Sequence, residues 1–260
     1  MTTPGKCAAP TTPAWDGAEL ANPHAHAEKP SKVRRMFAAI APSYDLNNRL
    51  HSLGIDRYWR RVAVRRAGVR AGEHVLDVAC GTGDLTQGFA ASPAARVVGL
   101  DFTREMLDIA ERKRARLPAG SAAKVTYIEG DATALPFDTG SFDVVSIAFG
   151  IRNVSDVPKA LGEFHRVLRP GGRLIVLEFD TPRNRIVRWL NTLYCARIMP
   201  RTATWISGDR SGAYAYLPAS VNTFMSREAL KDFMHDAGFA RMDDESLTLG
   251  LCACYRAWKG

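Results

Sequence analysis

A run of apolar residues that ends in an acid, followed at once by a turn of small residues, limits the folds open to this chain. The run is Val75-Leu76-Asp77-Val78-Ala79-Cys80, and Gly81-Thr82-Gly83-Asp84 follows it. Such a strand, turn and helix start is typical of parallel α/β sheets, which bind ligands at the carboxyl ends of their strands. Glycine at 81 and 83 lets the backbone approach a ligand, because no Cβ intervenes. A tight turn without a ligand has the same pattern, so the stretch needs support from elsewhere.

The residues around this turn favour S-adenosylmethionine (SAM) over a dinucleotide as the ligand. A dinucleotide-binding loop has a third glycine where this chain has Thr86. The carboxylate of Asp77 would repel a pyrophosphate, whereas SAM has an ammonium, a sulfonium and a neutral ribose. We therefore predict that Asp77, Gly81 and Gly83 belong to a SAM-binding site.

Three further units of the same kind follow along the chain. Val97–Asp101 is an apolar run that ends in an acid, at the distance of about twenty residues where a β-α-β unit places the carboxylate that binds a ribose diol. In the unit 125–132, Asp131 follows a strand and is placed to accept a hydrogen bond from an adenine amino group. The unit 142–150 ends in small residues. Four strand ends of this kind favour SAM over NAD.

The alternation of strands and helices predicts a doubly wound α/β fold. We expect a mostly parallel seven-stranded sheet of the Rossmann-like, class I SAM-methyltransferase type, closed by an antiparallel pair at 240–247 and 251–258. Residues 1–30 carry five prolines and are predicted to form a tail without regular structure. Residues 31–260 form the methyltransferase domain with an N-terminal helical extension, in which Pro42 ends a first short helix and a second surrounds 47–53.

Composition excludes some classes of protein. A hydrophobic fraction of 46% is sufficient for a large core, and the net charge of +8 permits an anionic partner without requiring one. No apolar run reaches the ~18 residues of a membrane span. The five cysteines form no C-x-x-C pair, which favours a reducing, cytoplasmic setting and gives no reason to expect a metal. No aromatic-rich basic strand is present, so we do not expect a nucleic-acid partner.

The predicted helix 55–67 has arginines over much of its surface, at positions 57, 60, 61, 65 and 66. A solvated cationic face is one interpretation of this pattern. A peripheral contact with a membrane is the other, because arginine on an amphipathic helix is attracted to anionic lipid.

Beyond the loop, the chain resembles the ubiquinone/menaquinone biosynthesis C-methyltransferase family from about Ser31 onward. The most specific matching stretches are Phe37-x-x-Ile40-Ala41-x-x-Tyr44-Asp45, Phe149-Gly150-Ile151-Arg152-Asn153 and Tyr214-x-Tyr216-Leu217. The resemblance implies a demethylmenaquinone methyltransferase-like enzyme of the SAM-dependent class I, which methylates a ring carbon of a polyprenyl benzoquinol or naphthoquinol. It implies SAM contacts at Thr82, Asp101, Asp131 and Ala132. Ala148 departs from the family's serine, and the lost hydrogen bond corresponds to ~1 kcal/mol at most.

The resemblance also implies residues for the chemistry. Arg152 is expected to stabilise the quinolate, because its guanidinium stays protonated and so does not readily abstract the proton itself. A structural ion pair of Arg152 at a strand end is the alternative. Asn153 is expected to hold a ring oxygen, Tyr44 to close the pocket over both ligands, and Asp45 to serve as base if Arg152 does not.

Several alternatives stay open at the level of sequence. The chain could methylate another small molecule or bind SAM without catalysis in a quinone-synthesis assembly, and an NAD-dependent oxidoreductase is disfavoured by Asp77 and Thr86. The sequence distinguishes neither benzoquinol from naphthoquinol nor the length of the prenyl tail. It also leaves open whether the chain forms a homo-oligomer.

Overall fold

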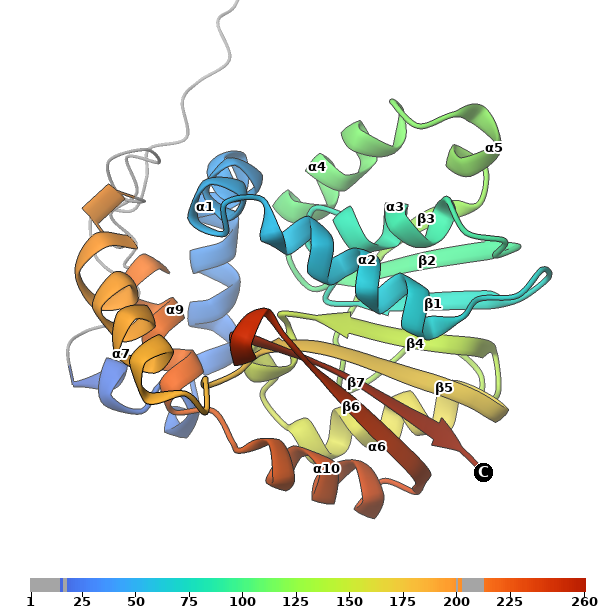
Figure 1. The fold of residues 1–260 in the computed structure, drawn as a ribbon. Helices are drawn as coiled ribbons and strands as arrows, with labels where there is room; N and C mark the ends of the chain where they lie inside the picture. The colour runs from blue at the N-terminus through green and yellow to red at the C-terminus, as the bar shows by residue number, and fades with distance from the viewer. Residues whose placement is uncertain (1–14, 16–17, 200, 203–212) are drawn as a thin grey trace, which may run out of the picture.

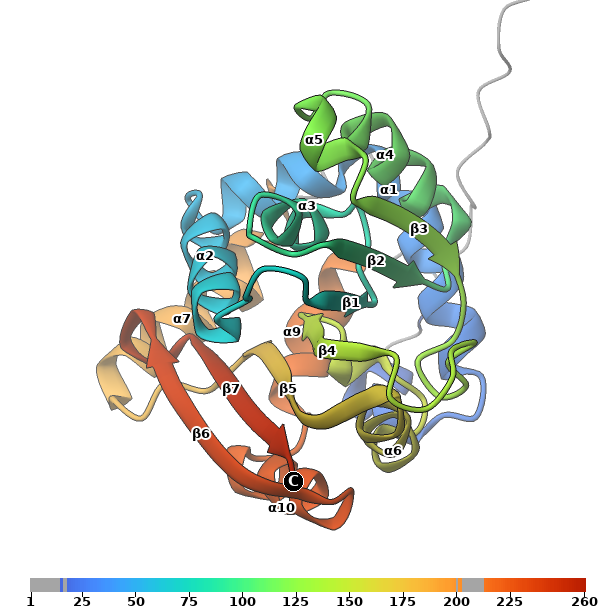
Figure 2. The same ribbon diagram turned by 90° about the vertical axis from the view of Figure 1, so that its right-hand side faces the viewer.

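One seven-stranded sheet organises the chain in a computed structural model that describes residues 15, 18–199, 201–202 and 213–260 (Figures 1 and 2). The strand order is β3-β2-β1-β4-β5-β7-β6, and β7 runs antiparallel to both of its neighbours while the other pairs are parallel. The predicted mostly parallel sheet with an antiparallel closing pair is therefore confirmed. The strands are β1 (His74–Val78), β2 (Arg96–Asp101), β3 (Val125–Glu129), β4 (Phe142–Ala148), β5 (Leu168–Phe179), β6 (Phe239–Leu247) and β7 (Cys252–Lys259).

Helices cover both faces of the sheet, because successive strand residues alternate between two cores. Val75 and Val144 pack with α2 (Ile55–Ala67) and α3 (Asp84–Ala90). Their neighbours Leu76 and Val145 pack on the other face with α6 (Val157–Val167) and α10 (Arg227–Asp236). The sheet is apolar on both faces, as a doubly covered parallel sheet requires. The remaining short elements near the sheet are α4 (Arg104–Arg114), α5 (Ala119–Ala122), η3 (Ile151–Asn153) and η5 (Thr248–Gly250).

A third group of helices lies at the end of the sheet toward which the arrow of β4 points in Figure 1. These are α1 (Lys29–His51), α7 (Arg185–Leu193), the π-helical turn η4 (Tyr194–Ile198) and α9 (Ala213–Asn222). The carboxyl ends of the parallel strands meet at this end, so the group stands over the place where a parallel sheet binds its ligands.

The prediction that Pro42 ends a helix is wrong. Pro42 lies inside α1, which continues for 23 residues from Lys29 to His51. Proline removes one helical hydrogen bond and costs roughly 3 kcal/mol, but its ring is exposed here. Val33, Met36 and Ile40 are buried against α4 and α9 in a common cluster, and this tertiary packing holds the helix together through the proline.

The described part of residues 1–30 differs from the predicted tail. Two 3-10 helices, η1 (Glu19–Ala21) and η2 (Pro23–Ala25), precede α1. The indole of Trp15 is buried and stacks on the ring of Tyr216 in α9, with 4.8 Å between ring centroids. The rest of the predicted tail, residues 1–14, 16 and 17, lies outside the described residues.

No helix in the described part of the chain is both long enough and apolar enough to cross a membrane.

Burial of Trp15 predicts a stability effect that a disordered tail would not show. We expect Trp15→Ala to lower the free energy of unfolding by about 3 kcal/mol, the usual cost of removing a buried indole. Trp189→Ala is the control, because that indole is exposed and its loss should change stability by only ~0.5 kcal/mol. Urea denaturation followed by circular dichroism measures both variants. Equal stability of Trp15→Ala and the parent protein would contradict the packing described above.

Candidate active site

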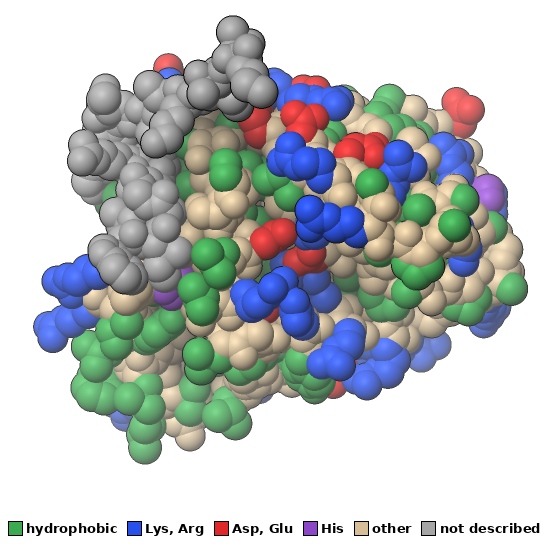
Figure 3. Space-filling view, turned by 90° about the horizontal axis from the view of Figure 1, so that it is seen from above, with side chains coloured by type: hydrophobic (Ala, Val, Ile, Leu, Met, Phe, Trp, Pro, Cys, Tyr) green, Lys and Arg blue, Asp and Glu red, His purple; other side chains and the backbone are tan. Residues whose placement is uncertain are grey.

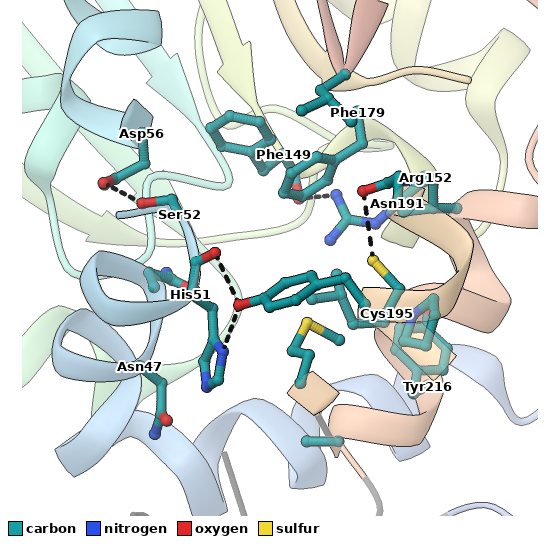
Figure 4. Close-up of a pocket in the computed structure, with 18 of the residues that line it drawn as sticks. Asn47, His51, Ser52, Asp56, Phe149, Arg152, Phe179, Asn191, Cys195 and Tyr216 are labelled. Carbon is teal, nitrogen blue, oxygen red and sulfur yellow. Dashed lines mark hydrogen bonds between the residues drawn. The ribbon is translucent and has the colours of Figure 1, made fainter. Parts of the chain in front are cut away.

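Two adjoining cavities lie between the strand ends and α1. The larger has a volume of about 430 Å³ and the smaller about 80 Å³. Phe37 and Tyr44 of α1 and Phe149 after β4 line both of them. The two cavities therefore adjoin at these three rings, and a group bound in one would lie next to a group bound in the other. Figure 4 shows the larger cavity.

The smaller cavity brings together most of the residues predicted from the strand ends. Gly81, Asp101, Asp131 and Ala132 line it, and Tyr44 and Asn153 close it from the side of α1 and η3. Asp77, Thr82 and Gly83 are not among its lining residues. The residues that line the cavity lie at the carboxyl ends of three strands: Gly81 after β1, Asp101 at the end of β2, and Asp131 and Ala132 after β3. These strands are neighbours in the sheet, so parallel pairing brings distant parts of the sequence to one edge.

Asp101 is the fixed carboxylate of this edge. Its Oδ2 accepts a hydrogen bond from the Gly81 amide (2.8 Å) and its Oδ1 one from the Thr103 amide (2.9 Å). Burial raises the pKa of Asp101, and these amide bonds oppose that rise. Each carboxylate oxygen retains a second lone pair. The side chain is thus held in a position to accept from two hydroxyl groups, such as those of a ribose diol.

Asp131 is the more exposed acid of the pair. Its Oδ1 accepts from both the amide (2.8 Å) and the hydroxyl (2.9 Å) of Thr133. None of the described residues donates to its Oδ2. That oxygen suits an exocyclic amino group, and Ala132 beside it offers an apolar surface.

The two glycines of the turn have different roles. Gly81 has φ +55°, and a Cβ there would meet nothing within 4 Å. A Cβ at Gly83 would collide with the hydroxyl of Tyr127. Gly83 is therefore required by packing against β3, rather than by close approach of a ligand as the sequence suggested.

Asp77 stands behind the cavity. It is 1% exposed; its Oδ1 accepts from the Ser146 hydroxyl (2.7 Å) and its Oδ2 from the Thr86 hydroxyl (2.6 Å). Burial raises the pKa of Asp77 to about 6, although both hydrogen bonds act in the opposite direction. Thr86, at the position of a dinucleotide loop's third glycine, thus braces this acid. Asp77 places a negative charge behind the cavity without lining it.

A cluster of charged residues outside the cavities fastens α1 to the turn. The Thr82 hydroxyl donates to Asp45 Oδ1 (2.6 Å), and Lys113 of α4 donates to Asp45 Oδ2 (2.8 Å) and forms an ion pair with Asp84. Asp45 lines neither cavity. Its carboxylate is committed to this cluster, which argues against the role of reserve base that the sequence suggested.

Most of the surface of the larger cavity is apolar, although polar and charged side chains also line it. Apolar side chains come from α1, α2, β5, α9 and the segment after η5, among them Met36, Ile40, Trp59, Phe149, Phe179, Leu217, Val221 and Leu251. Its size falls within the ~300–1,000 Å³ of small-molecule sites, and a predominantly apolar wall with a few placed polar groups is typical of them.

Among the described residues, Arg152 is one of four charged residues that line the larger cavity, with Asp56, Arg60 and Asp180, and it is only 4% exposed (Figure 4). Its Nη1 donates to Glu178 Oε1 and to the Phe149 carbonyl, both at 2.6 Å, and its guanidinium stacks 5.2 Å from the centroid of Phe179. Burial raises the pKa of Glu178, while the Arg152 charge lowers it. The structural ion pair therefore exists. Nη2 has no acceptor among the described residues, so the guanidinium can still donate to a bound ligand.

His51 of α1 is another polar residue that lines this cavity (Figure 4). The Tyr194 hydroxyl donates to the His51 carbonyl (3.1 Å) and lies 3.0 Å from Nδ1. The hydroxyl has one proton. When this proton is given to the carbonyl, Nδ1 donates to the hydroxyl oxygen and Nε2 carries the lone pair, and we assign this tautomer. Nε2 is buried and has no partner among the described residues. Burial lowers the pKa of His51, which keeps the ring neutral.

The sequence missed the residues that hold Arg152 and Asn153. Lys29 donates to the carbonyls of Arg152 (2.9 Å) and Val154 (2.8 Å), and Asn153 Oδ1 accepts from the Tyr216 hydroxyl (2.9 Å). Burial and the nearby Arg152 lower the pKa of Lys29 to about 8. Glu178, an acid at the end of an apolar strand, carried a signal in the sequence. Tyr216 lies in a stretch that matches the family, but nothing in that stretch indicated its contact with Asn153. Lys29 carried no signal.

Comparison with known sequences gives a family. A sequence model of the "ubiE/COQ5 methyltransferase family" matches residues 25–259. The demethylmenaquinone methyltransferase of Thermus thermophilus is 48% identical over 221 residues, which cover 85% of this chain and 98% of the relative. The ubiquinone/menaquinone biosynthesis C-methyltransferase UbiE of a Geobacter species is 43% identical over 234 residues, covering 89% of this chain and 98% of the relative.

Comparison with solved structures confirms the fold. A SAM-dependent methyltransferase of Thermotoga maritima superposes with a TM-score of 0.60 at 20% identity, covering 86% of this chain and 98% of the other. One of Aquifex aeolicus gives 0.56 at 18% identity, covering 77% and 89%. Both share the class I SAM-methyltransferase architecture.

The buried charge of Asp77 can be separated from its hydrogen bonds by replacing it with asparagine. Asp77→Asn can still bond to both hydroxyls, so we expect a folded protein whose affinity for SAM falls about tenfold, or ~1.4 kcal/mol. The raised pKa means that folded Asp77 binds more protons than unfolded Asp77 between pH 4 and pH 6. Its contribution to the free energy of unfolding therefore falls by roughly 2 to 3 kcal/mol as the pH rises through that window.

Urea denaturation of both proteins from pH 4 to pH 8, with calorimetric titration of SAM at pH 7.5, measures these effects. The difference in stability between the variant and the parent should grow in favour of the variant as the pH rises to 6 and then stay constant. A pH-independent difference together with unchanged SAM affinity would contradict both assignments.

Proposed function

The chain belongs to the ubiE/COQ5 methyltransferase family, and on that premise we propose that it transfers the methyl group of SAM to a ring carbon of a polyprenyl quinol in respiratory quinone biosynthesis. The observation that carries this proposal is the pair of cavities, one edged with acids and one apolar, that meet at Phe37, Tyr44 and Phe149. A methyl donor in one cavity and an apolar ring in the other would meet beside these residues and be aligned for transfer, which removes much of the entropic cost of a bimolecular reaction.

SAM supplies a methyl group already activated by its sulfonium. The donors and acceptors of the smaller cavity suit it, with Asp101 for the ribose hydroxyls, Asp131 and Ala132 for the adenine, and Gly81 for close backbone approach. Asp77 does not line the cavity, but its negative charge nearby favours the cationic ammonium and sulfonium groups of SAM. Thr82 contributes by holding α1 through Asp45. The cavity of about 80 Å³ is smaller than a typical ligand site, so we expect α1 to shift outward when SAM binds.

The larger cavity suits the quinol. Its apolar wall suits an aromatic ring and the first part of a prenyl tail, and we assign the hydroxyl groups to Arg152 and His51, which both line the cavity. A ring carbon becomes nucleophilic when a neighbouring hydroxyl is deprotonated, because the charge delocalises onto that carbon. His51 Nε2 accepts the proton, and Arg152 Nη2 stabilises the resulting oxyanion. Tyr44, which lines both cavities, closes the pocket over both ligands. Asn153 faces the cofactor side, where it positions the Phe149 carbonyl and Tyr216 (3.4 and 2.9 Å) rather than the ring.

Peripheral contact with a membrane fits a lipid-like substrate. On α2, Arg60 and Arg66 form ion pairs with acids of this chain, but Arg57, Arg61 and Arg65 are exposed at a spacing of one helical turn. These three arginines are available to anionic lipid phosphates.

The acceptor class is tested by incubating the protein with methyl-labelled SAM and one of three acceptors: a demethylmenaquinol, a benzoquinol precursor or RNA. We expect label on the ring carbon of a quinol and none on RNA. Label transfer to neither quinol would refute the proposed reaction.

The role of Arg152 can be tested with a substitution that keeps the positive charge of its buried ion pair with Glu178. Arg152→Lys should lower kcat by ~100-fold, because lysine cannot reproduce the second guanidinium nitrogen, while the Kd of SAM stays within about twofold. Glu178→Gln is the matched control, since it breaks the ion pair but leaves the guanidinium in place, and its loss of kcat should be smaller. Near-normal turnover of Arg152→Lys would show that Arg152 has a structural role alone.

His51 can be tested with a variant that keeps its bond to Tyr194. The amide nitrogen of asparagine occupies the place of Nδ1, so His51→Asn removes the Nε2 acceptor alone. We expect kcat to fall by roughly 100-fold, as for loss of a general base. Because the pKa of His51 is lowered, the acidic limb of the parent's kcat/KM profile should lie below pH 6.5 and be absent in the variant. An unchanged profile would exclude His51 as the base.

A further inference from the structure

Helix α7 presents an apolar face that the described part of the chain leaves uncovered. None of its residues is buried. Ile186, Trp189 and Leu190, at helical spacing, are 69%, 64% and 52% exposed, and Ile198 of η4 is 49% exposed. Figure 3 shows hydrophobic side chains gathered at the lower left, on the side of the molecule where α7 lies. Soluble proteins rarely expose large apolar side chains in such a group without a binding partner.

The segment that contains α7 is strongly basic. Residues 181–202 include Arg183, Arg185, Arg188, Arg197 and Arg201 but no acidic residue. All five are exposed, and none forms an ion pair with a residue that the structure describes. Two of them donate only to backbone carbonyls, Arg188 to those of Pro182 and Arg183 and Arg201 to that of Arg197. Their charge therefore remains available to an anionic partner.

Two more exposed leucines lie at the tips of turns near α7. Leu53 joins α1 to α2 and is 86% exposed, and Leu249 in η5 is 76% exposed. Both have a positive φ, 52° and 57°, that leucine rarely adopts. η5 abuts the start of α7, since a Cβ at Gly250 would lie 3.2 Å from Pro182 Cα. On the other side, the Tyr194 hydroxyl joins η4 to His51, two residues before Leu53.

These segments surround the opening of the larger cavity. Leu53 lines it directly, together with Asn191, Thr192 and Tyr194 from the α7–η4 segment and Leu251 from beside η5. A ligand tail that left the cavity between them would emerge among exposed apolar side chains. We call Leu53, Ile186, Trp189, Leu190, Ile198 and Leu249 the docking face.

We propose that the docking face seats on the surface of an anionic lipid bilayer and inserts α7 at the depth of the headgroups, so that a prenyl tail passes from the bilayer into the larger cavity. A short helix with an apolar face, a tryptophan and flanking arginines is the pattern of an interfacial helix. The positive charge of the segment complements lipid phosphates. An uncharged protein surface as partner would not complement this charge, and a basic one would repel it.

This surface differs from the basic face of α2. The core-facing apolar residues of α2, Trp59 and Val62, are buried, and Tyr58 is 43% exposed without an apolar neighbour of that exposure on the helix. α2 therefore contributes charge but no apolar face of the kind that α7 has. The route for the tail rests on the proposed function, whereas the apolar face and the unpaired arginines do not depend on it.

Flotation with vesicles tests the proposal directly. The full chain is mixed with vesicles of phosphatidylglycerol and phosphatidylethanolamine, or of phosphatidylcholine alone, and centrifuged through a sucrose gradient. We expect flotation with the anionic vesicles and little with the neutral ones. Ile186→Glu/Trp189→Glu should lower the floated fraction at least fivefold. The control Arg112→Gln/Arg116→Gln lowers the net charge equally near the end of α4, on the opposite side of the molecule in Figure 1, and should float like the parent.

A second readout separates docking from the reaction. Neither substituted residue of α7 lines a cavity, so SAM affinity and turnover of a quinol without a tail should be unchanged. Turnover of a long-tailed quinol embedded in the vesicles should fall about tenfold. Ile186→Ser/Trp189→Ser repeats the test without new charges. If the parent methylated no quinol, the proposed function would fail, and flotation would still decide the docking face.

Three results would overturn the proposal. The glutamate variant could float like the parent, or the parent could fail to float with anionic vesicles. In the third, sedimentation shows a dimer that the glutamate substitutions convert to a monomer while flotation is unchanged, and the face is then an interface between two copies of the chain.

Discussion

Buried carboxylates at the carboxyl ends of the strands hold the surrounding segments of the site in place. A buried carboxylate is tolerated only when donors replace its hydration, and each of these acids takes its donors from a different segment. Asp77 binds the hydroxyls of α3 and β4, Asp101 binds the amides of the turn after β1 and of Thr103, and Glu178 binds Arg152. The acids thereby fix the positions of the loops that line both cavities. Their burial also raises the pKa of each acid.

Helix α1 connects the two cavities to each other and to this set of acids. It contributes Phe37 and Tyr44 to both cavities. At its C-terminal half, Asp45 is bound by Thr82 and Lys113, and at its start Lys29 holds the carbonyls of Arg152 and Val154. A single helix thus contacts the turn after β1, the segment that contains Arg152 and the residues shared by the two cavities. An outward shift of α1 would open the small cavity and loosen the floor of the large one together, which couples binding of the two ligands.

The sequence predicted the features that arise from local pattern. Strands ending in acids gave the parallel sheet, and Gly81, Asp101, Asp131 and Ala132 do line one cavity. It was wrong about Pro42, because buried contacts of α1 with α4 and α9 outweigh the local cost of proline. Asp77 and Thr82 were expected to contact the ligand, whereas in the structure they bind Ser146 and Asp45. These partners lie 69 and 37 residues away along the chain, so the local sequence did not reveal them. The contacts of Lys29 and Tyr216 depend on how α1 and α9 pack, which no short stretch of sequence reveals.

The central claim is that the methyl donor and the quinol ring meet where the two cavities adjoin, beside Phe37, Tyr44 and Phe149. The most direct measurement is a filtered nuclear Overhauser experiment on the protein with SAM labelled in its methyl carbon and an oxidised, unreactive quinone. Cross-peaks from that methyl group to the ring protons of Tyr44 and Phe149 and to the quinone ring are the predicted result. Cross-peaks to the quinone without either aromatic ring, or saturation of the protein by SAM with no methyl contact to the quinone, would contradict the account.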